Sequence, residues 1–435
     1  MTQKLILTTM LSLISLLLLP TAAADDFSYP PEWEKQESVW LGWMAPSEPP
    51  NSPGGQLEAA QNQVRVQLIS EMLSGSRVTL LVSKAADEAH ARQMLVEAKL
   101  PLERIDFFYA PVSDPFVRDA GPRFASNGKK LGVLDIPWTC YGYDPQVIGA
   151  YLAECLARED TANRYAQERS LSMVKGRAVS EGGALDATDT LLMGYLDTAM
   201  QRNPGMTQAE IEADYLATYG KQKMIWLSRS PVSDRPGQKA GKVFGWGANG
   251  HVDEYARFVN ETTVVIAQVG DVPENDPLAA KDAEILRSNL ADLRAARTVD
   301  DQPLNVITMP AANPVMFGYQ APLGMPSIPP GWATLAGLEP SEMVTHVPAV
   351  SYMNFVITND KVIVPAYWQD GLPESVRADD QRAGEVLAEL FPDRKLVRIN
   401  PLPINWWGGG MHCMTQQQPA LGDAESATSG QGHTG

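Results

Sequence analysis

Basic residues are in short supply in this chain of 435 residues. Its 35 lysines and arginines stand against 52 aspartates and glutamates, which gives a formal net charge of −17 at pH 7. Nucleic acids and anionic membranes are bound through basic surfaces, so this balance argues against both as partners. An acidic surface attracts cationic ligands, although the same charge also serves simple solubility.

Long apolar runs are also scarce. Only residues 1–24 contain one, and they combine Lys4, an apolar run over residues 5–19 and the small residues Ala22-Ala23-Ala24. This arrangement is typical of an export signal, with cleavage ahead of Asp25. We expect an exported protein, periplasmic or secreted, with no stable membrane insertion after signal removal; a retained anchor is the alternative. We expect residues 25–419 to form one domain and the polar residues 420–435 to be a disordered tail.

Cysteine is rare, with three residues in all: Cys140, Cys155 and Cys413. An odd number in an exported chain leaves one thiol without a partner. Cys140 and Cys155 are close in sequence and could pair, which would leave Cys413 free, but sequence alone does not decide the pairing. A free thiol in an oxidising compartment is a liability, so a chemical use for it is favoured.

Several cofactor motifs are missing. The chain has no Cys-x-x-Cys, no His-Glu-x-x-His, no phosphate loop and no Gly-x-Gly-x-x-Gly after a predicted strand. A metal site built from His251, Asp253, His412 and Cys413 is an alternative, since all are ligand types. His412 and Cys413 are neighbours, however, and neighbours in extended chain point to opposite faces. We therefore expect no metal.

Strand and helix signals alternate along the chain. A unit of strand, strand, helix and strand is predicted twice, over residues 256–309 and 352–399, without a literal sequence repeat. Such recurrence suggests α/β units repeated around a centre; an ordinary α/β sandwich is the alternative. The remaining predicted elements are strands at 38–43, 77–83 and 104–109 and helices at 57–73 and 90–98.

Four glycine-containing polar segments lie at the ends of predicted strands, at 114–122, 180–185, 250–254 and 406–415. Taken by itself, each segment predicts only a turn. In the third segment, His251 and Asp253 are two residues apart and would face one side of an extended strand. In the fourth, Gly408-Gly409-Gly410 precedes Cys413 and permits close approach of another group to the backbone. A nucleophile assembled through space with a distant histidine fits this pattern.

Taken in series, these segments resemble the agmatine deiminase and bacterial peptidylarginine deiminase family of the guanidino-group-modifying superfamily. The resemblance implies an α/β fold, the five-bladed β/α propeller or pentein fold, with strand-strand-helix-strand units around a central active-site funnel. The matching segments, in order, are Pro31-Glu32-Trp33, Trp40 and Trp43, 118–122, 181–183, 250–253, 351–355 and 408–417.

The resemblance also implies roles for individual residues, and no metal or organic cofactor. Cys413 is the expected nucleophile, His251 the acid and base, and Glu181 the carboxylate that orients the histidine. A guanidinium presents its N–H donors in a fixed fork that carboxylates can grip. Asp119 and Asp253 are the carboxylates expected to hold the guanidinium. Asn354 and Trp43 are expected to line the site. Arg118 and His412 are expected to be structural.

The substrate is less sharply indicated. Agmatine, converted to N-carbamoylputrescine and ammonia, is the first expectation, because residues 138–144 lack the arginine pair with which arginine-acting relatives hold a carboxylate. The export signal favours the alternative, a peptidylarginine or arginine deiminase that makes citrulline. An amidinotransferase and a non-catalytic secreted binding protein are alternatives of other classes. The expected partner is a small cationic guanidinium or an arginine side chain; a homo-oligomer is left open.

Overall fold

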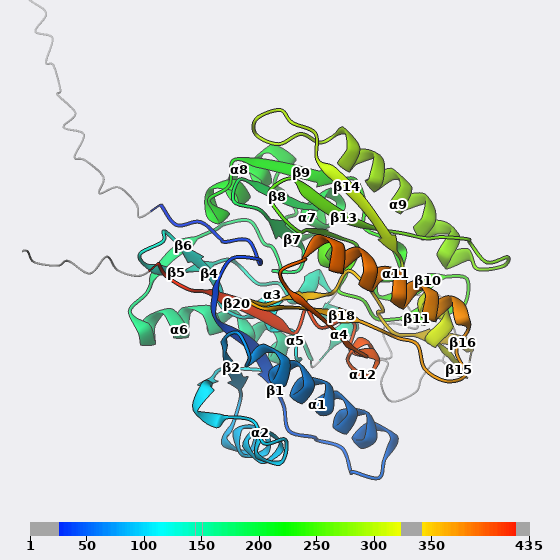
Figure 1. Ribbon diagram of the computed structural model, residues 1–435, viewed down its shortest axis with the longest axis horizontal. Coiled ribbons are helices and arrows are strands. Elements are labelled where there is room, and N and C mark those ends of the chain that lie inside the picture. Colours follow the sequence, from blue (N-terminus) through cyan, green and yellow to red (C-terminus); the bar gives the residue numbers. More distant parts are fainter. Residues whose placement is uncertain (1–25, 144, 150, 323–341, 423–435) are drawn as a thin grey trace, which may run out of the picture.

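The computed structural model describes residues 26–143, 145–149, 151–322 and 342–422 (Figure 1). The predicted export signal lies outside these ranges, as does the predicted tail beyond its first three residues. Those three are ordered against the body, since Ala420 N–H donates to the Lys35 carbonyl and Gly422 N–H to that of Gly128. No helix in the described ranges has the length and apolarity needed to cross a bilayer.

Five sheets share one plan: two antiparallel strands, followed by a third strand parallel to the second. One of them joins the two ends of the chain and carries an additional strand, β3 (Ile105–Tyr109). The five, in strand order, are β20 (Thr415–Pro419), β1 (Gln36–Trp43) and β2 (Arg77–Val82); β4 (Arg123–Ser126), β5 (Leu131–Asp135) and β6 (Ser172–Lys175); β7 (Leu185–Ala187), β8 (Leu191–Tyr195) and β9 (Lys223–Leu227); β12 (Ala256–Phe258), β13 (Thr263–Gln268) and β14 (Asn305–Pro310); and β17 (Val356–Ile357), β18 (Lys361–Pro365) and β19 (Lys395–Ile399).

Helices connect the parallel strands, because parallel neighbours need a crossover. Figure 1 shows α1, α9 and α11 on the outside of the molecule. The crossovers are α1 (Pro53–Met72), α4 (Pro145–Ile148) with α5 (Tyr151–Leu156) and α6 (Asp160–Arg169), α7 (Leu196–Arg202) with α8 (Gln208–Tyr219), α9 (Pro277–Ala295) and α11 (Glu374–Leu390), and α2 (Ala85–Glu97) connects β2 to β3.

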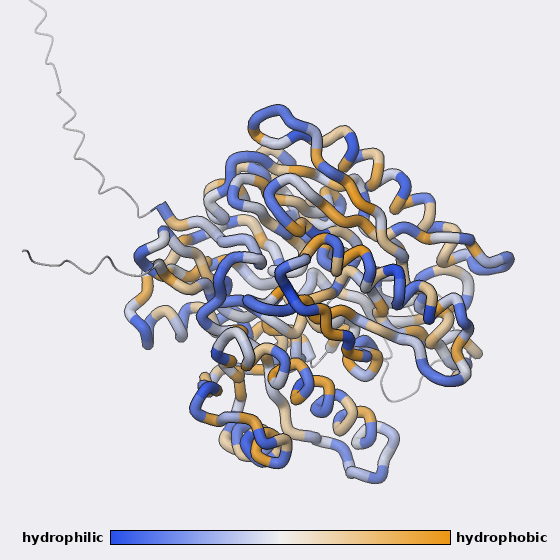
Figure 2. The backbone as a smooth tube through the Cα atoms, in the orientation of Figure 1, coloured by the Kyte–Doolittle hydropathy of each residue, from blue (hydrophilic) through white to orange (hydrophobic). Residues whose placement is uncertain are grey.

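The apolar residues of the strands and the inner helix faces fill the interior. Hydrophilic residues mark the outer turns, whereas β13, β14 and β18 carry hydrophobic residues (Figure 2). The largest clusters of buried side chains lie between adjacent sheets and their helices. A sixth sheet stands apart from this plan and contains β10 (Gly237–Ala240), β11 (Val243–Gly245), β16 (Met343–Val347) and β15 (Tyr319–Pro322).

The predicted α/β class and the predicted strand-strand-helix-strand unit are confirmed, but some local predictions are wrong. The segment at 180–185 leads into a hairpin, β7 and β8, that was not predicted. Its turn forms because the Thr188 hydroxyl accepts from the N–H groups of Thr190 and Leu191. The unit predicted over residues 352–399 begins only at Val356, the first residue of β17.

One feature of this plan positions the site. In every one of the five sheets, a polar segment lies immediately before the first strand of the antiparallel pair. These segments carry Asp119 before β4, Glu181 before β7, His251 and Asp253 before β12, Asn354 before β17 and Cys413 before β20.

Candidate active site

The segment that carries Cys413 is held by close contacts that exclude larger residues. It follows a helical turn, α12 (Leu402–Asn405), and Cys413 precedes β20, so the expectation that it follows a strand is wrong. A Cβ on Gly410 would lie 2.5 Å from Asn354 Oδ1. That oxygen accepts from the N–H groups of His412 at 2.7 Å and Cys413 at 3.3 Å. The missing side chain therefore lets Asn354 fix the backbone beside the sulfur.

His251 lies between two carboxylates. It caps a 3₁₀ turn, η5 (Val252–Glu254), rather than a strand, and its N–H donates to Asp234 at 2.7 Å. Its Nδ1 is 3.6 Å from Asp119 Oδ1 and its Nε2 is 3.7 Å from Glu181 Oε2. Burial alone would lower the pKa of His251, but the charges of Asp119, Glu181 and Asp253 raise it to about 9. The imidazole is therefore protonated at neutral pH.

Glu181 is fully buried and remains ionised. Burial alone would raise its pKa, but Arg202, whose Nε donates to Glu181 Oε1 at 2.8 Å, and His251 together lower it to about 2. Asp119 accepts from Gly183 N–H at 3.0 Å and from the Tyr141 hydroxyl at 3.2 Å. Burial raises the pKa of Asp119 to about 6, against the charge of His251.

Gly183 allows these groups to meet. A Cβ there would lie 2.7 Å from His251 Nδ1 and 2.9 Å from Asp253 Oδ2. The same Asp253 oxygen is 3.5 Å from Cys413 Sγ. The sulfur and the imidazole thus flank one carboxylate, although η5 is not an extended strand.

His412 anchors that carboxylate. Its Nδ1 is 2.6 Å from Asp253 Oδ2 and its Nε2 is 2.6 Å from Glu32 Oε2, so the ring bridges two acids. Glu32 also accepts from Arg257 at 2.6 Å. Burial would raise the pKa of Asp253, but the hydrogen bond and charge of His412 lower it. His412 was expected to be structural, and from this position it holds Asp253 in the ionised form.

The sulfur of Cys413 contacts one hydrogen-bond donor, the Asn354 amide, and two acceptors, the carboxylates of Glu254 and Asp253. Asn354 Nδ2 is 3.2 Å away, Glu254 Oε1 3.4 Å and Asp253 Oδ2 3.5 Å. Burial raises the pKa of the thiol well above its usual value, and the charges of Asp253 and Glu254 add to the effect. Ligand atoms of Asp253, Glu254 and Cys413 lie within 4.8 Å of one another, the spacing a metal ion would need.

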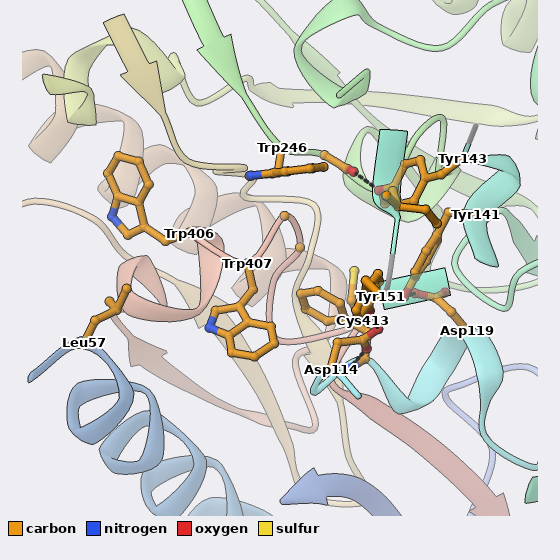
Figure 3. A pocket seen from close by; sticks show the side chains of 16 residues that line it. Leu57, Asp114, Asp119, Tyr141, Tyr143, Tyr151, Trp246, Trp406, Trp407 and Cys413 are labelled. Atoms are coloured by element: carbon orange, nitrogen blue, oxygen red, sulfur yellow. Dashed lines mark hydrogen bonds between the residues drawn. The ribbon is translucent and has the colours of Figure 1, made fainter. Parts of the chain in front are cut away.

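A cavity of about 390 Å³ opens onto the sulfur (Figure 3). In this view Cys413 lies between Tyr141 and Asp119 on one side and Leu57, Trp406 and Trp407 on the other, with Asp114 below it. Aromatic rings make up much of the wall, from Phe116, Tyr141, Tyr143, Tyr151, Trp246, Trp406 and Trp407.

A disulfide supports the tyrosine side of this wall. Cys140 and Cys155 are bonded, which answers the pairing question that sequence left open, and Cys413 is the free thiol. Cys140 and Tyr141 both have positive φ, 55° and 59°, a region that side chains rarely adopt. The disulfide therefore secures a left-handed turn that aims the Tyr141 hydroxyl at Asp119.

The structure brings together six of the residues expected at the site: Cys413, His251, Glu181, Asp119, Asp253 and Asn354. Trp43 is different, because it lies in the core, with its Nε1 donating to His90 Nδ1 at 3.2 Å, and does not line the cavity. Its strand, β1, is central in its sheet, so its apolar side chain serves packing. Sequence reasoning missed Glu254, next to Asp253, and Glu32, in a motif quoted without a role.

Comparison with known proteins decides the family. Residues 28–419 match the family described as Porphyromonas-type peptidyl-arginine deiminase. The chain belongs to this family. As a guanidine-group deiminase it is a hydrolase, as predicted. A relative from Pseudomonas syringae pv. tomato, named agmatine deiminase, is 28% identical over 92% of this chain and 97% of its own length.

The fold is shared with solved structures. The agmatine deiminase of Enterococcus faecalis superposes with a TM-score of 0.67 at 24% identity, covering 91% of this chain and 97% of that one. This likeness shows the fold, a mixed α/β architecture of the pentein type.

Proposed function

We propose that this deiminase hydrolyses agmatine or a close analogue, a guanidine on an alkyl chain without a carboxylate. The composition of the cavity wall carries the proposal. Among its described lining residues the carboxylates are Asp114 and Asp119, and there is no arginine, lysine or histidine. The nearby Arg158 is buried and committed to the Asp114 carboxylate and the Phe116 carbonyl. A substrate carboxylate would therefore lose water without gaining a cation.

The acidic groups fit the cationic end of such a substrate. Asp119 and Asp253 flank His251, and Asp253 Oδ1 is buried without a hydrogen-bond partner among the described residues. The two carboxylates can accept from the N–H fork of a guanidinium and fix its carbon against Cys413 Sγ. The positive charge of the substrate then offsets the acids that raise the pKa of the thiol, and favours the thiolate.

The reaction follows from these positions. The thiolate attacks the guanidinium carbon and forms a C–S bond, giving a tetrahedral adduct. Protonated His251 gives its proton to the departing nitrogen, which leaves as ammonia and produces a thiouronium. Neutral His251 then takes a proton from water, and the hydroxide attacks the same carbon. The C–S bond breaks, the hydroxyl of this second adduct gives up its proton within the site, and the neutral ureido product is released.

A substrate panel tests this proposal. Ammonia release is measured with agmatine, free arginine, and peptides with internal or C-terminal arginine. We expect kcat/KM for agmatine to exceed that for arginine by at least ~100-fold, since a site rejects groups it leaves buried and unpaired. Formation of a new guanidine from an added amine would instead show an amidinotransferase. Equal or faster turnover of arginine or of a peptide would overturn the assignment and favour the peptidylarginine reading.

We also infer that residues 26–419 form one catalytic propeller. Five sheets have the same strand plan, and the segment before the first antiparallel strand of each carries a residue of the site. Radial repetition around a centre accounts for that regularity, because equivalent segments of all units then meet at one axis. Inserting a short loop at the outer end of one crossover helix should leave kcat unchanged; loss of activity from every such insertion would contradict this arrangement.

Export is the third part of the proposal. The N-terminal sequence has the pattern of a signal, and the Cys140–Cys155 disulfide suits an oxidising compartment. Expression with and without residues 1–24, followed by fractionation and mass spectrometry of the mature N-terminus, tests it. We expect cleavage before Asp25 and a non-cytoplasmic product; an intact N-terminus in the cytoplasm would refute export.

A further inference from the structure

The proton of the nucleophile needs an acceptor, and His251 is unsuited to be that acceptor. Its neighbouring carboxylates raise the pKa of His251 to about 9, so the ring enters the cycle already protonated. That proton is required by the departing ammonia. The thiol is protonated too, because burial and acidic neighbours raise its pKa. If the proposed deimination is correct, another group must take the thiol proton before or during attack.

Two acceptors lie within hydrogen-bond distance of the sulfur in the described chain. Asp253 Oδ2 is 3.5 Å from Sγ, and Glu254 Oε1 is 3.4 Å from it. Asn354 Nδ2, at 3.2 Å, is an amide donor and takes no proton.

Asp253 is poorly suited to the task. Its Oδ2 is shared with His412 at 2.6 Å, and that contact lowers the pKa of Asp253. Its negative charge is also needed to grip the substrate. A proton placed there would weaken substrate binding and the contact with His412 at once.

Glu254 has the opposite character. It is buried, and both burial and the neighbouring Asp253 and Asp234 raise its pKa well above the usual value, so this carboxyl favours the protonated form. Asn354 Nδ2 contacts Glu254 Oε1 at 3.0 Å and Cys413 Sγ at 3.2 Å. One amide group thus aligns the donor and the acceptor of the proton.

We propose that Glu254 is a further catalytic residue, which accepts the thiol proton of Cys413 as the sulfur attacks. The S–H bond breaks and an O–H bond forms on Glu254, while the sulfur electron pair makes the C–S bond. When the C–S bond breaks at the end of the cycle, Glu254 returns the proton to the sulfur.

The substrate sets this transfer in motion. In the free enzyme, the acids around Glu254 and Cys413 keep both groups protonated. The entering guanidinium cation favours release of one of these two protons to water, so that a single proton remains to be shared between Cys413 and Glu254. The hydroxyl proton of the second adduct replaces the released proton when the C–S bond breaks. The charged and titratable groups that bear on Glu254 are Asp253 on the same turn, Asp234, Asp119, Lys239, Tyr367 and Cys413.

Glu254→Gln provides the test, since glutamine has the same size and can still accept from Asn354 but cannot take a proton. We expect kcat to fall by at least ~100-fold at pH 7, the usual contribution of a positioned proton acceptor. The residual kcat of Glu254→Gln should rise with pH over the range in which kcat of the parent enzyme is constant, because hydroxide then takes the thiol proton in place of the carboxylate. Glu254→Asp, which keeps the acid one methylene further away, should recover part of the rate.

A merely electrostatic role predicts the reverse. Removing a carboxyl group that competes with the thiol for ionisation would make the thiol easier to ionise, so Glu254→Gln would retain its rate or move the acidic limb of kcat/KM to lower pH. That result, or an aspartate variant no better than the glutamine variant with both folded by circular dichroism, would overturn the proposal. Glu385→Gln, an exposed carboxylate on α11, is the matched control and should be unaffected. If the agmatine assignment fails, the parent enzyme itself will not prefer agmatine in the substrate panel. The role of Glu254 is tested separately, by the ratio of kcat between each variant and the parent on whichever guanidine the parent hydrolyses.

Discussion

Replacing Glu32 by glutamine should destabilise the protein although Glu32 does not touch the sulfur. The carboxylate is 5% exposed and bridges His412 and Arg257, each at 2.6 Å, with Arg118 at 3.7 Å. Its other oxygen accepts from Ile357 N–H at 2.8 Å. Glutamine can preserve the last contact, but it leaves a buried imidazole and guanidinium without their shared negative charge.

The magnitude follows from the burial. Breaking a buried ion pair by removing one partner costs about 3–5 kcal/mol, because the remaining charge is left without compensation. Asp186, 3.5 Å from Arg257 Nε, offsets part of this loss, so we expect a value at the lower end, about 3 kcal/mol. A matched control is Glu71→Gln, whose partner Lys361 is 2.8 Å away at a partly exposed site. That change should cost less than about 1 kcal/mol.

Urea unfolding of the two variants and the parent measures both values from the shift in midpoint at constant slope. The pH dependence has a defined sign. Burial opposes ionisation, but His412, Arg257 and Arg118 lower the pKa of Glu32, so its contribution is present above about pH 4.5 and is lost as pH falls below that. The gap between parent and Glu32→Gln should therefore shrink in acid. A loss equal to that of the control, or a gap that widens in acid, would refute the reasoning.

Three other predictions concern the site. Cys413→Ala should abolish ureido formation while leaving the circular dichroism spectrum unchanged; turnover in the purified variant would remove the sulfur from the mechanism. The pH profile of kcat/KM should be bell-shaped, falling below about pH 6 as Asp119 loses its charge and above about pH 9 as His251 loses its proton; a profile level across either limit would reassign that residue. Replacing Cys140 and Cys155 by serine should lower the free energy of unfolding by about 3 kcal/mol for a loop of this length. It should also lower kcat, because Tyr141 is held less firmly. Unchanged stability would show that the disulfide is dispensable.

Much of this site could be predicted because its chemistry is local in sequence. Each of Asp119, Glu181, His251 and Cys413 lies within three residues of a glycine that marks a turn, so the turn signal and the ionisable residue occur in the same short segment. The periodicity of the sequence also predicted β1, α1, β2, α2, β3, α9 and α11, although it did not predict the helices between β5 and β6 or between β8 and β9.

Other features depend on distance in space rather than in sequence. Glu32 reaches His412 across 380 positions of the chain, and no periodicity encodes such a contact. Trp43 was wrongly assigned to the site because the sequence around a tryptophan in a strand does not distinguish a side chain that faces a ligand from one that faces the core. The turn η5 was expected to be extended, since two-residue spacing alone does not distinguish a strand from a 3₁₀ turn that brings the same side chains together.

The pairing of β20 with β1 has a consequence for biogenesis. The attacking atom arrives with the last strand of the body, and that strand closes the sheet begun by the first. A polypeptide still emerging from the ribosome or crossing a translocon has neither its reactive sulfur in place nor a sealed edge on its opening sheet. Catalytic competence therefore appears only after β20 has paired with β1.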